Sequence, residues 1–210
     1  MRYRVVDLGL IDFEKAWHLQ KEVFAQVKAG LNESALIFCR HHPVITLGRA
    51  YRPENILAPE TELEKRKIKT YRIERGGDVT YHGPGQLTLY PVMDLRCLRQ
   101  DIHWFLRQLE SVIIRSLSAF GIQAQRQAGA TGVWVAQKKI ASIGIAIRNW
   151  ITFHGVSLNI KKNDLPNFAL IKPCGMDITM TALEEITGRD IEITAVREEL
   201  LRQFTQNFGG

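Results

Sequence analysis

Strand-like segments joined by short turns, with a few helical segments between them, constrain the fold of this chain more than any other feature of its sequence. The five residues Val135–Lys139 indicate a hairpin turn between two such segments, and Arg148–Ile151 indicates a second one. Strands that pair mostly as hairpins, with helices inserted between groups of them, are typical of a mixed or antiparallel β-sheet covered by helices. We therefore expect an α+β fold, a mixed β-sheet flanked by helices.

Hydrophobic periodicity gives the expected elements. The strand-like segments are Tyr3–Leu8, Ala35–Phe38, Val44–Leu47, Thr70–Glu74, Gln86–Val92, Gly132–Val135, Lys139–Ile147 and Thr152–Asn159. Helices are expected from the N-cap Asp12 to Gly30, from Asp101 to Gly121, over residues 194–208, and over Met180–Ile186 before a stop at Gly188. Because the 210 residues contain no repeat, linker or composition shift, we expect a single domain over residues 1–210.

Composition narrows the setting and the partners. With 45% hydrophobic residues the chain can bury a full core, and its three cysteines, an odd number without metal-ligand spacing, argue against a disulfide framework. The chain has no signal-peptide pattern and no apolar run long enough to span a bilayer, so we expect a cytoplasmic protein without a membrane partner.

The basic balance of charge leaves two interpretations open. A net charge of +6 is typical of a solvated surface, and it would also suit an acidic partner, a carrier protein as well as a nucleic acid. No helix-turn-helix, zinc or RNA-binding motif accompanies the charge, so we expect no nucleic-acid partner.

The densest unusual stretch is Arg75–Gln86, RGGDVTYHGPGQ, which places four glycines and a proline between two strand-like segments. Glycine lets backbone N–H groups approach a ligand closely, and Arg75 and His82 can address a polar head group beside that backbone. A tight structural loop is the alternative. The stretch matches neither the Walker A pattern nor Gly-x-Gly-x-x-Gly, so it is not a nucleotide-binding loop of those kinds.

Lys139 heads a small, apolar segment, residues 140–147. If its side chain faces an apolar pocket, desolvation lowers its pKa from about 10.4 toward the range of a general base. A surface lysine is the alternative interpretation.

The segment Phe153–Ile160 alternates in character. Strand periodicity places Gly155 and Ser157 on one face, and His154 and Val156 on the other. A face of small residues suits close approach by a ligand, or equally by a neighbouring strand.

Among the three cysteines, Cys174 has the most unusual context, because Pro173 and Gly175 predict an irregular turn around it. A nearby lysine would favour its thiolate, which is the nucleophilic form. Cys39 is expected to be a small buried residue, and Cys97 has no special context. On its residue chemistry alone, Cys174 is equally compatible with a structural role.

Taken together, these segments resemble the octanoyl-[acyl carrier protein]:protein N-octanoyltransferases. The matching segments, in family order, are Glu14–Trp17 with Gln20, His42–Arg49 (HPVITLGR), Arg75–Gln86, Lys139–Gly144 (KIASIG), Phe153–Asn159 (FHGVSLN) and Pro173–Gly175 (PCG). The resemblance extends from the first helix to about residue 188. Asp78 stands where some members carry glutamine, and Ala141 where others carry cysteine, and both departures concern substrate preference.

The resemblance implies a fold and a reaction. The fold is that of the biotin and lipoate protein ligases, which is also similar to that of class II aminoacyl-tRNA synthetases. The reaction transfers octanoyl from an acidic acyl carrier protein to a lysine ε-amine on lipoyl domains of 2-oxoacid dehydrogenases and of the glycine-cleavage H protein. The resemblance implies no cofactor, neither ATP nor a metal, and we expect a monomer.

The resemblance also implies roles for individual residues. Cys174 matches the nucleophile that carries the acyl group as a thioester, and Lys139 matches the lysine that lowers the pKa of that cysteine and moves protons. Substrate contacts are implied at Arg75, Gly76, Gly77, Asp78, Val79, Thr80, Tyr81, His82, Ser142, Ile143, Gly144, Gly155, Val156 and Ser157.

Three other functions remain open at this stage. An ATP-dependent lipoate ligase activates a free acid as an adenylate and needs no cysteine nucleophile, and the cysteine at 174 and the HGPGQ end of the glycine-rich stretch argue against it. A catalytically silent module that binds acyl groups or lipoyl domains is the second. The basic charge alone suggests the third, a nucleic-acid binder.

Overall fold

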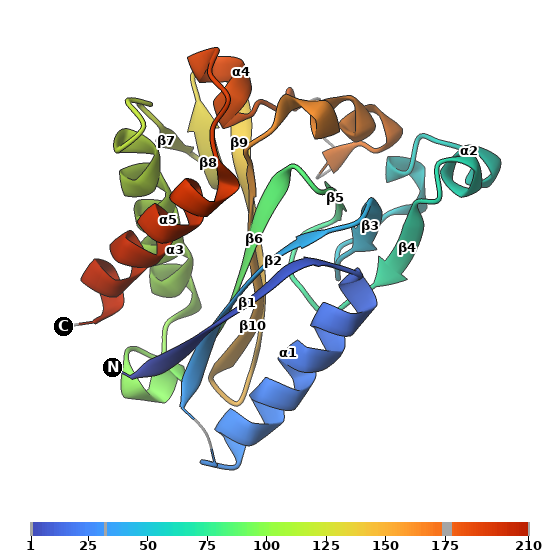
Figure 1. Cartoon of the computed structure of the whole chain (residues 1–210). Coiled ribbons are helices and arrows are strands. Elements are labelled where there is room, and N and C mark those ends of the chain that lie inside the picture. The colour runs from blue at the N-terminus through green and yellow to red at the C-terminus, as the bar shows by residue number, and fades with distance from the viewer. Residues whose placement is uncertain (1, 32, 174–177, 210) are drawn as a thin grey trace.

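Two β-sheets organise the residues that the structure describes, 2–31, 33–173 and 178–209 of a computed structural model (Figure 1). A seven-stranded sheet has the order β1-β2-β6-β10-β9-β8-β7, and a three-stranded sheet has the order β4-β3-β5. The strands are β1 (Tyr3–Ile11), β2 (Ser34–His41), β3 (Val44–Leu47), β4 (Lys69–Arg72), β5 (Val79–His82), β6 (Gln86–Val92), β7 (Gln125–Gln127), β8 (Ala130–Val135), β9 (Lys138–Arg148) and β10 (Ile151–Asn159). The pairs β1–β2 and β3–β4 are parallel and the other pairs are antiparallel, which confirms the mixed sheet expected from the sequence.

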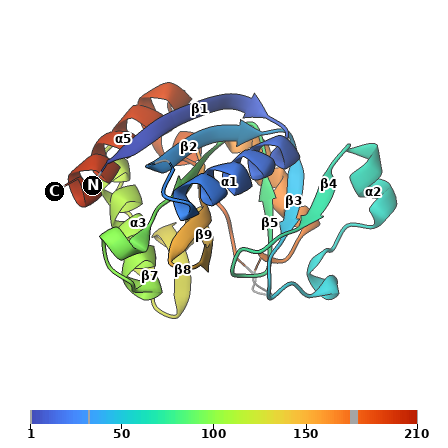
Figure 2. The same cartoon turned by 90° about the horizontal axis from the view of Figure 1, so that it is seen from below.

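Helices cover both faces of the larger sheet. The α-helices are α1 (Phe13–Lys28), α2 (Glu60–Lys65), α3 (Ile102–Ser118), α4 (Leu183–Thr187) and α5 (Ile193–Phe208), and the 3-10 helices are η1 (Pro53–Asn55), η2 (Leu95–Cys97) and η3 (Lys162–Leu170). α1 packs on one face, against β2, β6 and β10, while α3 and α5 pack against each other on the opposite face (Figure 2). The fold is therefore α+β, with helices flanking a mixed sheet, as expected.

Strand β2 shows why its sequence is almost continuously apolar. Ala35 and Ile37 contact the α1 side of the sheet, whereas Leu36 and Phe38 contact the side covered by α3 and α5. A strand buried on both faces needs apolar residues at successive positions rather than at alternate ones.

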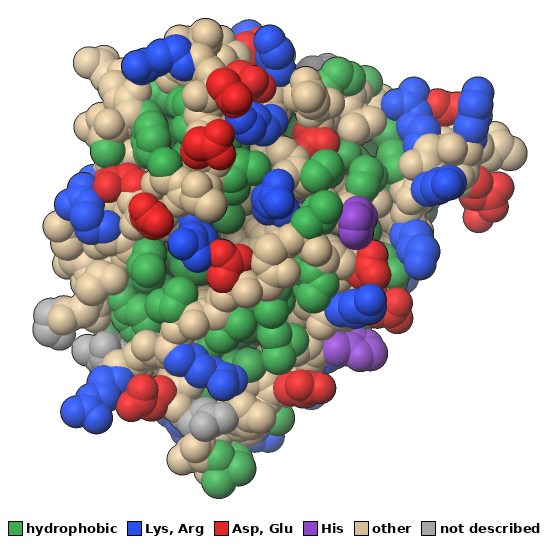
Figure 3. Space-filling model, in the orientation of Figure 1, with side chains coloured by type: hydrophobic (Ala, Val, Ile, Leu, Met, Phe, Trp, Pro, Cys, Tyr) green, Lys and Arg blue, Asp and Glu red, His purple; other side chains and the backbone are tan. Residues whose placement is uncertain are grey.

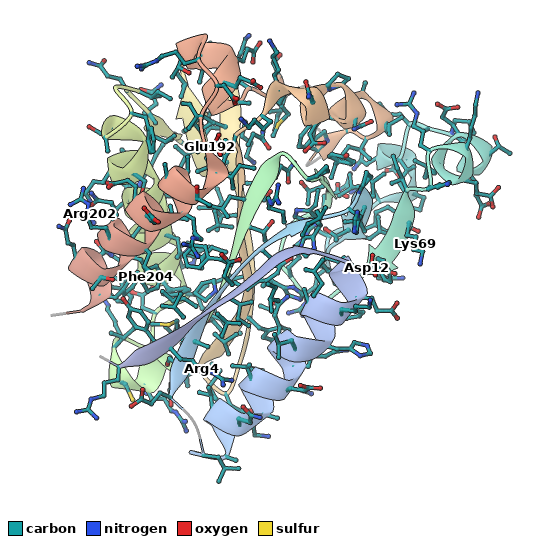
Figure 4. All side chains as sticks on the ribbon, viewed as in Figure 1. Arg4, Asp12, Lys69, Glu192, Arg202 and Phe204 are labelled. Atoms are coloured by element: carbon teal, nitrogen blue, oxygen red, sulfur yellow. The ribbon has the colours of Figure 1, made fainter. Side chains whose placement is uncertain are left out.

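The helix ends follow local chemistry. The side chain of Asp101 caps α3 by accepting the N–H of Trp104. Asp12 precedes α1 at the junction with β1 (Figure 4), but its side chain makes no capping bond there. Gly188 ends α4 with φ of 65°, a left-handed conformation that glycine adopts without strain.

Both predicted hairpin turns are confirmed. Val135 pairs with Lys138 across the first, and Arg148 pairs with Ile151 across the second. The central residues of the second turn, Asn149 and Trp150, have φ of 53° and 62°, which is the backbone of a tight two-residue hairpin.

Six elements were not expected, namely α2, β5, β7, η1, η2 and η3. The predicted helix at Met180–Ile186 begins later, at Leu183, and the predicted strand at Thr70–Glu74 ends earlier, at Arg72. None of the helices in the described ranges is long and apolar enough to cross a membrane.

The smaller sheet has a hydrophobic core of its own. Ile45 and Tyr81 from that sheet pack with Phe168 and Leu170 of η3 and with Leu63 of α2. The two sheets are thus supported by separate clusters of side chains, and a cavity lies where they meet.

Candidate active site

A cavity of about 370 Å³ brings together most of the residues singled out in the sequence. From those predictions it is lined by Arg75, Gly76, Gly77, Asp78, Val79, Thr80, His82, Lys139, Ser142, Ile143, Gly144, Gly155, Val156 and Ser157. Other described residues that line it are Phe13, Ile73, Thr88, Tyr90, Ile102, Leu106, Gly129, Ala130, Thr131, Ile145, His154 and Pro173. A mainly apolar cavity with a few polar groups is typical of a small-molecule site.

The first half of the glycine-rich stretch lies across β9. The N–H of Gly76 donates to the carbonyl oxygen of Ile145 at 2.9 Å. A Cβ at position 144 would lie 3.0 Å from both Arg75 Cδ and the Gly76 oxygen, so the absence of a side chain there lets this loop pack on the strand.

Arg75 is buried in spite of its charge. Its guanidinium donates to the Thr46 backbone oxygen at 2.7 Å, to Thr46 Oγ1 at 3.0 Å, and to the Gly76 oxygen at 3.0 Å. Arg75 therefore joins β3 to the loop, in addition to lining the cavity.

The second half of the stretch, Gly83–Gly85, encloses a protein carboxylate. A Cβ at residue 83 would collide with the Asp164 carboxylate, and one at residue 85 would lie 2.8 Å from Asp164 Oδ2. The Gly85 N–H donates to that same oxygen at 2.5 Å. Burial raises the pKa of Asp164. For these two glycines the structure therefore favours the structural interpretation over ligand contact.

Tyr81 does not line the cavity. Its hydroxyl accepts a hydrogen bond from Asn167 Nδ2 at 2.9 Å and lies 3.4 Å from Asp164 Oδ1. Its ring packs edge-on against Phe168, in the core of the smaller sheet. Among residues 75–82 it is the one that the cavity leaves out.

Lys139 is buried, with 4% of its surface exposed. Its Nζ lies 5.0 Å from the centre of the Trp134 ring, within range of a cation–π interaction. Its backbone N–H donates to the Thr179 oxygen at 2.8 Å, and its carbonyl oxygen accepts from the Thr181 N–H at 2.9 Å. The sequence leaves two interpretations of Lys139 open, a pocket residue or a surface residue. In the structure Lys139 lines the cavity.

Gly132 makes room for Lys139. With φ of 139°, it has a backbone conformation that other residues rarely adopt. A Cβ there would lie 2.7 Å from Lys139 Cε and 2.6 Å from the Ala141 oxygen. Glu110 of α3, fully buried and ion-paired with two arginines, accepts the Gly132 N–H at 3.2 Å.

Small and polar side chains of β9, β10 and β6 form another part of the wall. Ser157 Oγ donates to Gln86 Oε1 at 2.5 Å, and Ser142 pairs with Ser157 across the strands. Gly155 is small for a different reason, because a Cβ there would collide with the Leu89 oxygen of β6. Gly155 therefore fits the interpretation as close approach by a neighbouring strand, whereas Ser157 lines the cavity and its contact with a ligand stays a prediction.

His154 breaks the expected alternation along β10. Its φ of 57° is left-handed and unusual for a non-glycine residue in a strand. As a result the His154 ring lies beside the Phe153 ring, with 5.0 Å between their centres, and Phe153 contacts Phe24 of α1, while Val156 packs in the core on the other face. The prediction that His154 shares a face with Val156 is wrong for this physical reason.

A hydrogen bond connects His154 to Glu74 at 3.1 Å. Burial lowers the pKa of His154, so at neutral pH its ring is uncharged and donates from Nε2. That bond lowers the pKa of Glu74 to about 2, which makes this a carboxylate–imidazole hydrogen bond rather than an ion pair. Burial likewise lowers the pKa of His82 well below its usual range and that of His41 to about 4. All three histidines are therefore neutral near the cavity.

The two described cysteines behave as the sequence suggests. Cys39 is buried in the core beneath α1, and its burial raises the pKa of the thiol. Cys97 is exposed, on η2. Cys174 lies outside the described residues. Pro173, which precedes it in the sequence, lines the cavity together with Lys139.

Several lining residues carried no local signal in the sequence. Phe13 begins α1, Tyr90 belongs to a buried strand, Gly129 lies in the turn between β7 and β8, and Ala130 and Thr131 begin β8. Within the described ranges, no group of three or more His, Cys, Asp or Glu side chains is arranged to hold a metal ion.

The surface charge is not gathered into one patch on the face seen in Figure 3, where Lys and Arg side chains are interspersed with Asp, Glu and hydrophobic ones. That distribution is typical of a solvated surface.

Comparison with protein families matches residues 12–205 to the lipoyl protein ligase A/B catalytic domain. An octanoyltransferase from Thermoanaerobacter sp. (strain X514) is 40% identical over 207 residues, covering 98% of this chain and 90% of that protein.

Solved structures are similar over the whole chain. A lipoate-protein ligase A bound with ATP has a TM-score of 0.84 at 20% identity, covering 99% of this chain and 85% of that one. A biotin protein ligase from Aquifex aeolicus has a TM-score of 0.57 at 12% identity, covering 99% and 69%. At these identities the likeness is one of fold, and it confirms the ligase-like fold expected from the sequence.

Proposed function

The chain belongs to the octanoyltransferases of the lipoyl protein ligase A/B catalytic domain family, and on that premise we propose that it moves octanoyl from acyl carrier protein, through a thioester on Cys174, to a lysine ε-amine on a lipoyl domain. Octanoyl transfer in lipoylation is the activity of the family. The donor, the covalent intermediate and the acceptor are our proposal. We further propose that residues 1–210 act as one catalytic domain.

One observation carries the proposal. Lys139 lines a cavity together with Pro173, the residue directly before Cys174. On the far side of the undescribed residues 174–177, Thr179 accepts the backbone N–H of Lys139 at 2.8 Å. The chain thus enters that short segment from the wall of the lysine's cavity and leaves it hydrogen-bonded to the lysine's backbone, which supports a partnership between the two side chains.

The first half-reaction forms the acyl-enzyme. Lys139 takes the thiol proton of Cys174, and the thiolate attacks the thioester carbonyl of octanoyl-carrier protein. Backbone N–H groups in the Gly76–His82 loop stabilise the oxyanion. When the tetrahedral intermediate collapses, the carrier thiolate leaves and takes the proton from the Lys139 ammonium. The products are octanoyl-Cys174 and the free carrier thiol.

The second half-reaction gives the amide. The acceptor amine attacks the Cys174 thioester, and neutral Lys139 accepts its proton. The Cys174 thiolate leaves, which restores the starting thiolate–ammonium pair. Because the two groups titrate together, their pKa values belong to the pair. Since the donor is already a thioester, no step consumes ATP.

The surroundings of Lys139 suit this proton transfer. Its side chain is buried beside Trp134 and lies against the bare Cα of Gly132. Burial disfavours the charged form of a lysine, and a neutral amine is what the second half-reaction requires.

The test is an intact-mass measurement after incubation with octanoyl-carrier protein. We expect a hydroxylamine-labile octanoyl adduct on the wild type and on Cys97→Ser, a control at an exposed cysteine, but none on Cys174→Ala. Lys139→Ala should form the adduct slowly, with an altered pH dependence. A labile adduct that persists in Cys174→Ala, on Cys39 or Cys97, would contradict the proposal. ATP-dependent turnover of free octanoate would instead indicate a ligase.

A further inference from the structure

A surface segment, residues 48–58, connects the glycine-rich loop to the chain that leads into Cys174. We refer to this segment as the bridge. On the loop side, three of its backbone N–H groups donate to loop carbonyl oxygens: Gly48 to Asp78 at 2.9 Å, Arg49 to Arg75 at 2.9 Å, and Ala50 to Gly77 at 3.0 Å. The first residues of the bridge are therefore fixed to the part of the loop that lines the cavity.

The other end of the bridge pairs with residues 170–172. The backbone N–H groups of Leu57 and Ala58 both donate to the Leu170 oxygen, at 2.9 and 3.1 Å. Ile56 and Ile171 form an isolated antiparallel β-pair. The Lys172 N–H donates to the Asn55 oxygen at 2.8 Å. Lys172 is followed by Pro173, which lines the cavity.

Asp78 and Asn55 join these two halves through their side chains. Asn55 Nδ2 donates to Asp78 Oδ2 at 2.5 Å, and the Arg52 N–H donates to Asp78 Oδ1 at 3.2 Å. Both side chains are buried, with 7% of Asp78 and 4% of Asn55 exposed. Hydrogen bonds to a buried carboxylate are among the stronger ones in proteins, and losing one leaves a desolvated charge without a partner.

Asn55 therefore connects the glycine-rich loop with residues 170–172. Its side-chain amide holds the loop at Asp78, while its backbone oxygen holds Lys172. A shift of Asn55 changes the position of Lys172 and Pro173 relative to the cavity wall. The Asp78 carboxylate, in turn, is already occupied by protein donors, which limits what it can offer to a substrate.

We propose that Asp78 and Asn55 are a positioning pair that sets the place of Lys172 and Pro173 relative to the acyl-holding cavity, and hence the rate at which Cys174 is acylated. The inference rests on the proposed function, because it takes acylation of Cys174 as the step affected. Asp78 then acts by holding Asn55 in place, in addition to any contact with the acyl group.

A reciprocal exchange tests the pair. In Asp78→Asn, one acceptor oxygen becomes an NH2 group, which faces the Asn55 amide as donor against donor unless that amide turns over, so the charge-assisted hydrogen bond from Asn55 is lost. In Asn55→Asp, two carboxylates face each other at hydrogen-bond distance and repel. In the double variant, Asn at position 78 donates to Asp at position 55 and still accepts from Arg52. The hydrogen bond between residues 55 and 78 is thus restored with donor and acceptor exchanged.

The measurement is the rate constant of acyl-adduct formation, followed by rapid quench and mass at saturating and at low octanoyl-carrier protein. Misplacement of a reacting group by about 1 Å can slow a reaction about 100-fold, so we expect each single variant to be about 10- to 100-fold slower. The double variant should return to within about threefold of the wild type. Glu64→Gln, which removes one negative charge at an exposed position of α2, is the matched control and should react at the wild-type rate.

The exchange separates positioning from substrate contact, because residue 78 is Asn in both Asp78→Asn and the double variant. If Asp78 acts by touching the substrate, the double variant stays as slow as Asp78→Asn and both show a raised KM. That result would overturn the inference, and so would single variants that react at the wild-type rate. If Asn55→Asp does not fold, the comparison of Asp78→Asn with the double variant still decides. Absence of any Cys174 adduct on the wild type would refute the proposed function instead.

Discussion

Replacing Gly132 by alanine should disable Lys139 while leaving the rest of the cavity in place. Two contacts decide the outcome, since the new Cβ would lie 2.7 Å from Lys139 Cε and 2.6 Å from the Ala141 oxygen. Carbon atoms in contact are separated by about 3.5–4.0 Å, so the lysine terminus must move by about 1 Å. The Ala141 oxygen belongs to the backbone of β9 and yields less readily.

The magnitude follows from the two effects together. A non-glycine residue at a φ of 139° costs about 1–3 kcal/mol in backbone strain. A displacement of about 1 Å at a reacting group can slow catalysis about 100-fold. We therefore expect Gly132→Ala to lose about 2 kcal/mol of stability and to acylate about 100-fold more slowly.

The control is Gly121→Ala, after α3. Gly121 has a φ of 75°, and a Cβ there would meet nothing within 4 Å, so this variant has the backbone strain without the collision. Urea unfolding gives the stability of both variants, and single-turnover acylation with its pH profile gives the rate. If both variants lose similar stability and acylate equally fast, the space beside Lys139 does not matter and the reasoning fails.

Two pH-dependent effects on stability follow from the carboxyl groups of Glu74 and Asp164. The Glu74 pKa is lowered to about 2 by the His154 hydrogen bond, so its contribution is present above about pH 4.5 and disappears as the pH falls toward 2. Since Glu74 is 47% exposed, we expect Glu74→Gln to lower the free energy of unfolding by about 1 kcal/mol at pH 7 and to leave it unchanged near pH 2. Urea unfolding that gives the same difference between variant and wild type at both pH values would contradict this. The Asp164 pKa is raised by burial, so its stabilising contribution weakens as the pH rises above about 4. Asp164→Asn should remove this decline, and an unchanged pH slope would count against the assignment.

Elements with a strong local pattern could be predicted from the sequence. The hairpin β9–β10 combines apolar strands with a two-residue turn, and the helix end at Gly188 depends on a residue that adopts positive φ readily. Strand β5 was missed because it is four residues long and lies between glycines. The 3-10 helix η3 was missed because Pro166 stands inside it.

Residues that gather through tertiary contacts could not be predicted in the same way. Phe13 reaches the cavity because the start of α1 packs against Tyr71 and His82 of the smaller sheet, and Tyr90 lines it from β6; nothing in their own segments indicates this. His154 was placed on the wrong face because one left-handed residue shifts the side-chain alternation of a strand. Lys139 was found from its apolar context together with the family resemblance, and its pairing with Gly132 depends on the register between β8 and β9.

The fit of the Asp164 carboxylate between Gly83 and Gly85 bears on how this protein can vary in evolution or be redesigned. A side chain at Gly83 or at Gly85 would overlap the Asp164 carboxylate, so neither position can carry one while Asp164 is present. We expect substitutions at 83 to be accepted only together with a smaller residue at 164, whereas a Cβ at 85 would also lie 2.8 Å from Lys161 Cβ, so a change at 164 alone does not make room there. Such a change would also remove the acceptor of the Gly85 N–H. A glycine pattern that suggests ligand binding can thus be maintained by a partner about eighty residues away in the same chain.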